Sequence, residues 1–370
     1  MNMMGIIFSN IYDERLGDIT RRRTMASLPF GGRYRLIDFV LSNMVNAGIT
    51  NVGVITKQNY QSLMDHLGSG KEWDLDRKVD GLFILPPFGD GQKSVYRGKV
   101  EALWGTRRFL ERSNEEYVLL ADANIICNID YQKMLSEHVE SGAQISIITK
   151  RESIMGQKDA RDVIVRSDLS GKVKEVLMHY GIPGVASCGI GMYITKREFL
   201  LKLLYEANSY NLVDFEREIL QAKCGELDIH SIEFDGRILR IGCVEEYFCA
   251  NLALLEPEVR KEIFFRHGAV YTKILDEVPT RYLKGCSLKN SLVADGCTIM
   301  GEVENSVLFR GVYVGTGAKV KNCIIMQDTK IEDDVSLEYT ICDKDVCVTK
   351  GRLLAGAAGH PIIINKGKTI

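Results

Sequence analysis

The feature that most constrains the fold is a repeat in the C-terminal part of the chain. A motif of one polar residue, one small polar residue and two apolar residues stands at positions 305–308 and recurs, in related form, at 322–325 and 339–342, with a step of 17 residues. An earlier copy at 290–293 comes two residues early. A short fixed period is typical of chains that stack one structural unit on the next.

Within one step of the repeat, apolar residues fall about every six positions. Three sides of six residues, one of them shortened, predict a triangular parallel β-helix over residues 283–370. An ordinary antiparallel sandwich is the alternative, and it would require an apolar residue at every second position. The residues that carry the period are Leu308, Val314, Val320, Ile325, Ile331, Leu337, Cys342 and Val348.

The first 251 residues have a different texture, in which short apolar runs alternate with helical patterns. The runs "NMMGIIFSN", "NVGVITK", "EYVLLAD" and "AQISIITK" predict strands, and "YRLIDFVLSNMVNAG", "NYQSLMDHLGSG" and "KVEALWGTRRFLERSN" predict helices. This alternation favours an α/β domain with a mostly parallel, doubly wound sheet. Residues 252–282 read as a helical connector that runs into an extended segment. The expected domains are therefore 1–251, 252–282 and 283–370.

Composition excludes several classes of protein. The chain has 370 residues, is 45% hydrophobic and 26% charged, and carries a formal net charge of −2. This balance is typical of a globular protein and argues against a nucleic-acid or membrane-surface binder. No apolar run reaches the roughly 18 residues of a membrane span, and we see no signal peptide. None of the ten cysteines forms a CxxC pair, which argues against zinc and indicates free thiols in the cytoplasm.

Two strand ends are candidate site positions, because ligands of an open α/β sheet bind at the carboxyl ends of its strands. The strand in "YVLLADANIICNIDY" is followed by Asp122, Asn124 and Asp130. The first strand runs into a turn that contains no glycine before Gly17 and carries Asp13. Bulky and acidic side chains hinder the close approach of a phosphate to the backbone.

Several motifs resemble one known family. "LPFGGRYRLIDFVLSNMVNAGITNVGVIT", "WDLD", "ILPPF", "YRGKVEAL" and the C-terminal repeat look like ADP-glucose pyrophosphorylase (glucose-1-phosphate adenylyltransferase) of bacterial glycogen synthesis. The resemblance implies a Rossmann-like nucleotidyltransferase domain that joins glucose 1-phosphate and ATP and releases pyrophosphate. It also implies that the hexapeptide repeats form a left-handed parallel β-helix with roles in subunit contacts and allosteric control.

The reacting residues of that family are replaced in this chain. The glycines of its phosphate turn correspond to Asn10, Ile11 and Asp13, and its EKP sugar-phosphate motif has no counterpart after "GKVKEV". Its active-site lysine and its two metal-binding aspartates correspond to Met25, Asn124 and Arg240. Mg²⁺ prefers anionic oxygens, so the resemblance implies no catalytic residues and no cofactor on this chain, with Mg²⁺ held by a catalytic partner.

This pattern resembles the D-type regulatory subunit, which would join a catalytic subunit in a hetero-oligomer, by family precedent a tetramer. One alternative is an active adenylyltransferase that uses Asp122 as a substitute metal ligand, because Asp122 and Asn124 would share one face of a strand. Another alternative is an acyltransferase of the hexapeptide type. Such enzymes usually use a histidine of the β-helix, and residues 283–359 contain none.

A run of arginines offers a binding function. Arg33 and Arg35 follow Arg21, Arg22 and Arg23, and arginine forks suit phosphate. We predict a site for a phosphorylated effector at Arg33 and Arg35, joined by Arg310 or Lys330 of the β-helix. A solvated charged face or a salt-bridge network between subunits is the alternative.

Two histidines and the C-terminal segment complete the expectations. We expect a structural or pocket-rim role for His66 and assign none to His179. The C-terminal segment 350–370 is a candidate cap for the open end of the β-helix.

Overall fold

The computed structural model describes residues 2–10, 12–87, 96–156 and 161–370. They form two compact units, neither continuous in sequence. The first unit contains residues 1–11, 40–58 and 68–236, and the second contains residues 12–39, 59–67 and 237–370. The domain boundaries at 251 and 282 stay a prediction, because these units divide the chain at other points.

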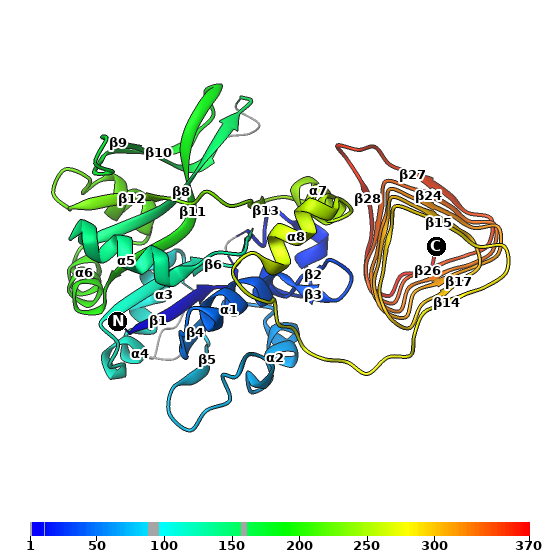
Figure 1. Cartoon of the computed structure of the whole chain (residues 1–370), viewed down its shortest axis with the longest axis horizontal. Helices are drawn as coiled ribbons and strands as arrows, with labels where there is room; N and C mark the ends of the chain where they lie inside the picture. Colours follow the sequence, from blue (N-terminus) through cyan, green and yellow to red (C-terminus); the bar gives the residue numbers. More distant parts are fainter. Residues whose placement is uncertain (1, 11, 88–95, 157–160) are drawn as a thin grey trace. The chain divides into compact units, whose positions relative to one another are not determined.

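A nine-stranded sheet is the centre of the first unit (Figure 1). The strands β6, β1, β4 and β5 are parallel, and β11 is antiparallel to β6, β8 and β9. The sheet is therefore mixed, and the prediction of a mostly parallel sheet is wrong for the part that contains β9, β10 and β11. The strands are β1 (Met3–Phe8), β4 (Asn51–Ile55), β5 (Gly81–Leu85), β6 (Tyr117–Asp122), β8 (Ile145–Ile154), β9 (Arg161–Ser167), β10 (Val173–Tyr180), β11 (Gly184–Lys196) and β12 (Ile229–Glu233).

The register of the parallel strands aligns their carboxyl ends. Phe8 at the end of β1 pairs with Ile55 of β4 on one side and with Asp122 of β6 on the other. All residues of β1, β4 and β6 are buried, as expected for parallel strands covered on both faces. The residues that follow these three strands therefore meet at one edge of the sheet.

Helices cover this sheet: α3 (Lys99–Gly105), α4 (Arg107–Arg112), α5 (Tyr131–Ser141), α6 (Arg197–Ser209) and the π-helical turn η5 (Phe215–Gln221). The single helix predicted from "KVEALWGTRRFLERSN" is broken at Thr106, which has non-helical φ and ψ of −108° and 9°. Gly105 and Thr106 are both poor helix formers, which explains the break. Asp130 caps α5, because its carboxylate accepts the backbone N–H groups of Gln132 and Lys133.

The second unit starts with short elements that precede or flank the β-helix. They are η1 (Gly17–Thr20), η2 (Met25–Ser27), β2 (Pro29–Phe30), β3 (Tyr34–Arg35), α2 (Gln61–Leu67), β13 (Leu239–Arg240), α7 (Val244–Ala253) and α8 (Pro257–Phe265). The helix α1 (Leu36–Asn46) passes from the second unit into the first, and β7 (Ile125–Ile126) and η3 (Lys71–Trp73) belong to the first.

The predicted parallel β-helix is confirmed, and its triangular coils are visible in Figure 1. Val307 pairs with Ile324, and Ile324 pairs with Ile341, so neighbouring coils follow the 17-residue step. Its sides form three parallel sheets. The first sheet contains β14 (Arg281–Tyr282), β17 (Thr298–Ile299), β20 (Tyr313–Val314), β23 (Lys330–Ile331) and β26 (Cys347–Val348). The second sheet contains β15 (Ser287–Lys289), β18 (Glu302–Glu304), β21 (Lys319–Lys321), β24 (Ser336–Glu338) and β27 (Leu353–Ala355). The third sheet contains β16 (Leu292–Val293), β19 (Val307–Leu308), β22 (Ile324–Ile325), β25 (Thr340–Cys342) and β28 (Ile362–Ile364).

The polar residue that opens each repeat has a conformational reason. Asn290, Asn305 and Asn322 have φ between 42° and 52°, and Tyr339 has φ of 46°. Asparagine tolerates this left-handed conformation better than most residues. The C-terminal residues add the last coil, and Ile370 pairs through its backbone with Cys347 and Thr349, in keeping with a capping role.

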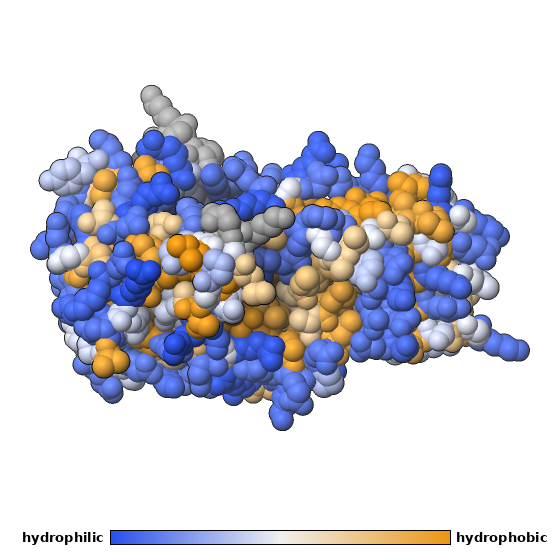
Figure 2. All heavy atoms as spheres, turned by 90° about the horizontal axis from the view of Figure 1, so that it is seen from above, coloured by the Kyte–Doolittle hydropathy of each residue, from blue (hydrophilic) through white to orange (hydrophobic). Residues whose placement is uncertain are grey.

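Three further facts concern the surface, membrane-spanning helices and the cysteines. On the face shown in Figure 2 hydrophilic residues predominate, and hydrophobic residues form separate patches. No helix in the described part of the chain is long and apolar enough to cross a membrane. All ten cysteines are free thiols, as predicted.

Candidate functional site

A cavity of about 260 Å³ lies at the carboxyl ends of the parallel strands. Its lining includes Phe8 and Asn10 after β1, Lys57 after β4, and Lys99 at the start of α3. The Asn10 side chain accepts the N–H of Lys57 at 3.0 Å and donates to the carbonyl of Gln58 at 3.3 Å. Asn10 therefore links two strand ends, whereas Ile11, the next predicted turn position, lies outside the described residues.

Asp122, the last residue of β6, contacts a lysine. The ammonium nitrogen Nζ of Lys99 lies 2.8 Å from Asp122 Oδ2 and 2.5 Å from Oε1 of Glu216. The hydroxyl of Tyr193 donates to the same Glu216 oxygen at 3.0 Å. The rings of Phe8 and Tyr193 have their centroids 5.3 and 5.4 Å from Lys99 Nζ, so aromatic faces complete the surroundings of the cation.

The charges of this triad depend on one another. Burial alone would lower the pKa of Lys99, but Asp122 and Glu216 raise it well above its ordinary value. Burial raises the pKa of Asp122 to about 6, with Glu216 acting in the same direction and Lys99 opposing both. At neutral pH Lys99 is therefore an ammonium and Asp122 a carboxylate.

Asn124 is buried and lies in the turn after β6, not in the strand itself. The expectation that Asp122 and Asn124 share a strand face is wrong, because β6 ends at Asp122. The side-chain oxygen Oδ1 of Asn124 is buried and has no hydrogen-bond partner among the described residues. It offers one neutral carbonyl oxygen.

These residues do not fit a divalent metal ion. Mg²⁺ takes anionic oxygens, but Asp122 is bound to an ammonium and Asn124 is neutral. No group of three or more His, Cys, Asp or Glu side chains suited to a metal ion occurs in the described ranges. Gly191, in the left-handed conformation at φ 68°, packs so closely against the Asp122 carboxylate that an added Cβ would lie 2.3 Å from Oδ2. The Asp122 carboxylate therefore occupies space that only a glycine at position 191 leaves open.

Met25 and Arg240, the other replaced positions, belong to the second unit. Met25 is fully buried in η2, and its N–H donates to Asp13 Oδ1 at 2.7 Å. A buried thioether supplies no charge to a phosphate. Arg240 is part of β13 and half-buried.

A second cavity, about 170 Å³ in volume, lies entirely within the second unit. We call it the basic pocket, because Arg33, Arg35, Lys273, Arg310 and Lys344 line it together with one carboxylate residue, Asp65. The basic pocket lies between the β2–β3 hairpin and the β-helix. The structure thus brings Arg33 and Arg35 together with Arg310, as the sequence suggested.

Each cation of the basic pocket is held differently. Arg35 donates from Nη1 to the carbonyl and hydroxyl oxygens of Ser62 at 2.6 and 2.9 Å, and burial lowers its pKa to about 10. Arg310 is only 7% exposed, and its Nε has no partner among the described residues. Burial and the neighbouring Arg33 lower the pKa of Arg310. Burial, followed by the charges of Arg35 and Arg23, lowers the pKa of Lys344 to about 8.

Other predicted residues lie outside this cluster or have structural partners. Lys330 does not line the basic pocket and instead pairs with Glu332 at 3.0 Å. His66 lines the pocket, and its Nε2 lies 2.5 Å from Asp38 Oδ1, in keeping with the rim role expected for it. His179 and Asp162 both belong to the first unit, and His179 Nδ1 lies 3.2 Å from Asp162 Oδ1. Arg23, from the arginine run, is buried against Asp343.

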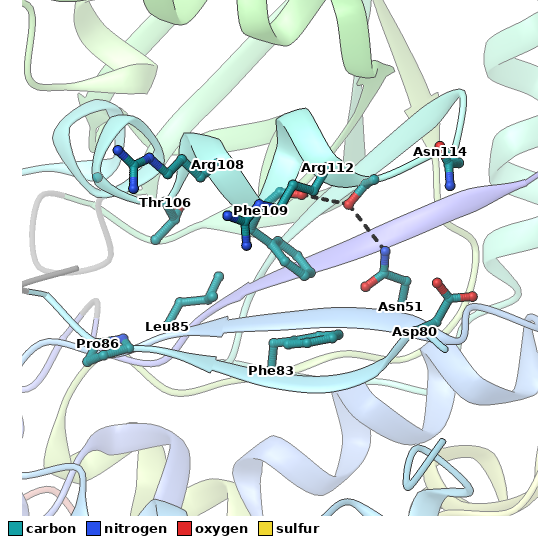
Figure 3. Close-up of a pocket in the computed structure, with 12 residues that line it drawn as sticks. Asn51, Asp80, Phe83, Leu85, Pro86, Thr106, Arg108, Phe109, Arg112 and Asn114 are labelled. Carbon is teal, nitrogen blue, oxygen red and sulfur yellow. Dashed lines mark hydrogen bonds between the residues drawn. The ribbon is translucent and has the colours of Figure 1, made fainter. Parts of the chain in front are cut away.

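A third cavity, about 430 Å³ in volume, lies between α4 and the edge strand β5 (Figure 3). Phe83 and Phe109 form its apolar wall, with ring centroids 5.2 Å apart. Asn51 points toward this space from the start of β4 and donates to the Ser113 hydroxyl at 3.2 Å. None of the predicted site residues lines this cavity, so we assign it no chemistry.

Sequence reasoning missed Lys99, Glu216 and Lys344. Lys99 and Glu216 lie far apart in the sequence, each beside apolar helical residues. Lys344 is one of the polar residues between two apolar positions of the repeat, Cys342 and Val348. No local pattern distinguishes these residues from ordinary surface charges.

The fold and both sites define a class of protein. An α/β sheet with a site at its strand ends, followed by hexapeptide coils, is the architecture that the resemblance to nucleotidyltransferases predicted. The family model described as "Nucleotidyl transferase" matches residues 4–163, and the one described as "GlmU-like, C-terminal hexapeptide" matches residues 278–356. The predicted fold class, a Rossmann-like nucleotidyltransferase domain followed by a left-handed parallel β-helix, is confirmed.

Individual relatives narrow the class. The chain is 37% identical over 367 residues to the glycogen biosynthesis protein GlgD of Bacillus subtilis, covering 99% of this chain and 96% of the relative. It is 34% identical to the glucose-1-phosphate adenylyltransferase of Clostridium perfringens strain 13, covering 98% of this chain and 93% of that protein. The chain belongs to the glucose-1-phosphate adenylyltransferase (ADP-glucose pyrophosphorylase) family.

Proposed function

We propose that this chain is a regulatory subunit in glycogen biosynthesis. In this role it associates with a catalytic glucose-1-phosphate adenylyltransferase, modulates its activity in response to a phosphorylated effector, and has little or no activity alone. The likeness to GlgD proteins and to adenylyltransferases supports the pathway. The basic pocket is the observation that carries the regulatory role.

The charge of the basic pocket favours an anionic ligand. Five cationic side chains face one carboxylate, and burial lowers the pKa of His66 so that it stays neutral. Crowded cations repel one another, and a phosphate would relieve this repulsion. Burial is the main cause of the lowered pKa of Lys344, and the charges of Arg35 and Arg23 lower it further.

The geometry of the basic pocket favours a phosphoryl group. A cavity of about 170 Å³ is smaller than the roughly 300–1,000 Å³ of typical small-molecule sites, so it suits one phosphate and leaves the rest of an effector outside. Arg310 is buried, and its Nε has no hydrogen-bond partner within the part of the chain that the structure describes. A buried N–H without a partner costs free energy, and a phosphate oxygen would accept its hydrogen bond.

Low catalytic activity is the other part of the proposal. The buried thioether of Met25 and the neutral amide of Asn124 lack the charges that phosphoryl transfer requires. The active-enzyme alternative depends on Asp122 as a metal ligand, and the contact between Lys99 and Asp122 argues against it. No observation on the described residues favours an acyltransferase.

One experiment tests the function as a whole. ADP-glucose formation is measured for the purified chain alone, for a catalytic subunit alone and for the two together, with and without sugar phosphates. We expect negligible turnover by the chain alone, and in the mixture a rate or an effector response that the catalytic subunit lacks by itself. Robust Mg²⁺-dependent turnover by the chain alone, or a mixture indistinguishable from the catalytic subunit, would contradict the proposal.

A further inference from the structure

The ammonium group of Lys99 lies between the side chains of Asp122 and Glu216 at the carboxyl end of the sheet. It lies within 2.8 Å of both Asp122 and Glu216, and all three side chains are at least four-fifths buried. The three residues come from α3, β6 and η5, so one cation connects three elements of the first unit.

We propose that Lys99 is a built-in cation that neutralises Asp122 and Glu216 and excludes a divalent metal ion from this edge of the sheet. The carboxylates need a positive charge nearby, because two buried like charges in contact with one group repel each other strongly. Lys99 supplies that charge from the chain itself.

The covalent attachment of this cation gives it an advantage over a free ion. A divalent ion must be taken from solution and stripped of water, whereas Lys99 is held beside its partners by the first turn of α3. To ligate Asp122, a metal ion would have to displace the ammonium, which would then remain nearby and repel it.

The consequence is an edge of the sheet that keeps one arrangement whatever the concentration of Mg²⁺. The elements α3, β6 and η5 stay connected without a metal. Such a chain would present the same structure to a partner at any Mg²⁺ concentration, while a catalytic subunit binds the metal ion.

The experiment compares Mn²⁺ binding and thermal stability among variants of the full chain. Lys99→Met keeps an unbranched apolar side chain and removes the charge, leaving Asp122 and Glu216 facing a vacant cation position. We expect Mn²⁺ to raise the Tm of Lys99→Met, by about 5 to 10 °C at about 100 times its Kd, and to leave the wild-type Tm unchanged. Electron paramagnetic resonance of free Mn²⁺ measures the binding directly.

Two further variants serve as controls. Lys57→Met removes another lysine of the same cavity, and this variant should stay insensitive to Mn²⁺. Lys57 packs on the Tyr96 ring and pairs with no carboxylate in the described part of the chain. Lys99→Met combined with Asp122→Asn removes one of the two carboxylates, and the Mn²⁺ response should fall sharply.

Two results would overturn the proposal. The first is Mn²⁺ binding to the wild-type chain that Asp122→Asn abolishes, which can be measured even if Lys99→Met does not fold. The second is a folded Lys99→Met variant that ignores Mn²⁺. Neither an effector nor a partner subunit takes part in this experiment, so its failure is distinguishable from failure of the proposed regulatory function.

Discussion

Arg23 and Asp343 are 320 residues apart in the sequence and form a buried, two-pronged ion pair. Nη2 of Arg23 lies 2.7 and 2.8 Å from the two carboxylate oxygens, and the side chains are 5% and 4% exposed. The pair connects the segment before β2 to the fourth full coil of the β-helix, next to Lys344 of the basic pocket. Arg23 of the arginine run therefore has a structural role, whereas Arg33 and Arg310 line the basic pocket.

Breaking this pair should destabilise the second unit. Asp343→Asn leaves the Arg23 charge buried without compensation, which typically costs about 3–5 kcal/mol. Removing both charges with Arg23→Met and Asp343→Asn should cost clearly less than either change alone, because no buried charge is then left unpaired. Denaturant unfolding measures the loss. The exposed pair Lys289–Glu304 is the matched control, and Glu304→Gln should change stability by at most about 1 kcal/mol.

Removing the buried arginine of the basic pocket should weaken phosphate binding. A hydrogen bond to a charged group contributes about 1.5–3 kcal/mol, so Arg310→Met should raise the Kd for inorganic phosphate or a sugar phosphate about 10- to 100-fold. Lys330→Met is the matched control, since it removes a β-helix cation outside the pocket. Calorimetry gives both constants. Equal effects of the two substitutions, or none from Arg310→Met, would show that the pocket is not the site.

Phosphate binding should weaken as the pH rises through about 8. The free pocket holds Lys344 with a pKa lowered to about 8, and a bound anion would raise that pKa because it favours the charged form. Binding therefore takes up a proton above this pH, and affinity is highest below pH 8 and falls between pH 8 and 10. A sugar phosphate is already dianionic there, because the second pKa of a phosphate monoester is about 6.

The same titration identifies Lys344 as the group responsible. Lys344→Arg keeps its charge across this range, so its affinity should vary little with pH. Lys344→Met should bind weakly at all pH values. A wild-type affinity that does not change between pH 7 and 9.5 would exclude Lys344 from the site.

Restoring catalysis should require a change at Lys99 as well as at the replaced family positions. The variant with Met25→Lys, Asn124→Asp and Arg240→Asp regains the expected charges but keeps Asp122 bound to the ammonium. We expect it to gain little Mg²⁺-dependent ADP-glucose formation, and to gain about 100-fold more when Lys99→Met is added. Either single carboxylate alone should restore nothing. High activity of the first variant without the Lys99 change would show that Lys99 does not block the site.

The sequence by itself determined the repeat architecture and most of the elements around the sheet. Coils of a β-helix contact only their neighbours, so the period of Leu308, Ile325 and Cys342 in the sequence is the period of the structure. Helix caps and strand runs are local for the same reason, as Asp130 at the start of α5 illustrates. The family motifs led to the prediction that Met25, Asn124 and Arg240 replace reacting residues of the family, and that correspondence stays a prediction.

Only the tertiary structure decided which charges meet. Lys99 and Glu216 are 117 residues apart, and Arg23 and Asp343 are 320 apart, so no local period relates them. Charged side chains reach their partners through the packing of distant elements, and their pKa values depend on that burial. The sequence could therefore predict a site at Arg33 and Arg35, but only the fold placed Arg310 and Lys344 beside them in the basic pocket and left Lys330 outside it.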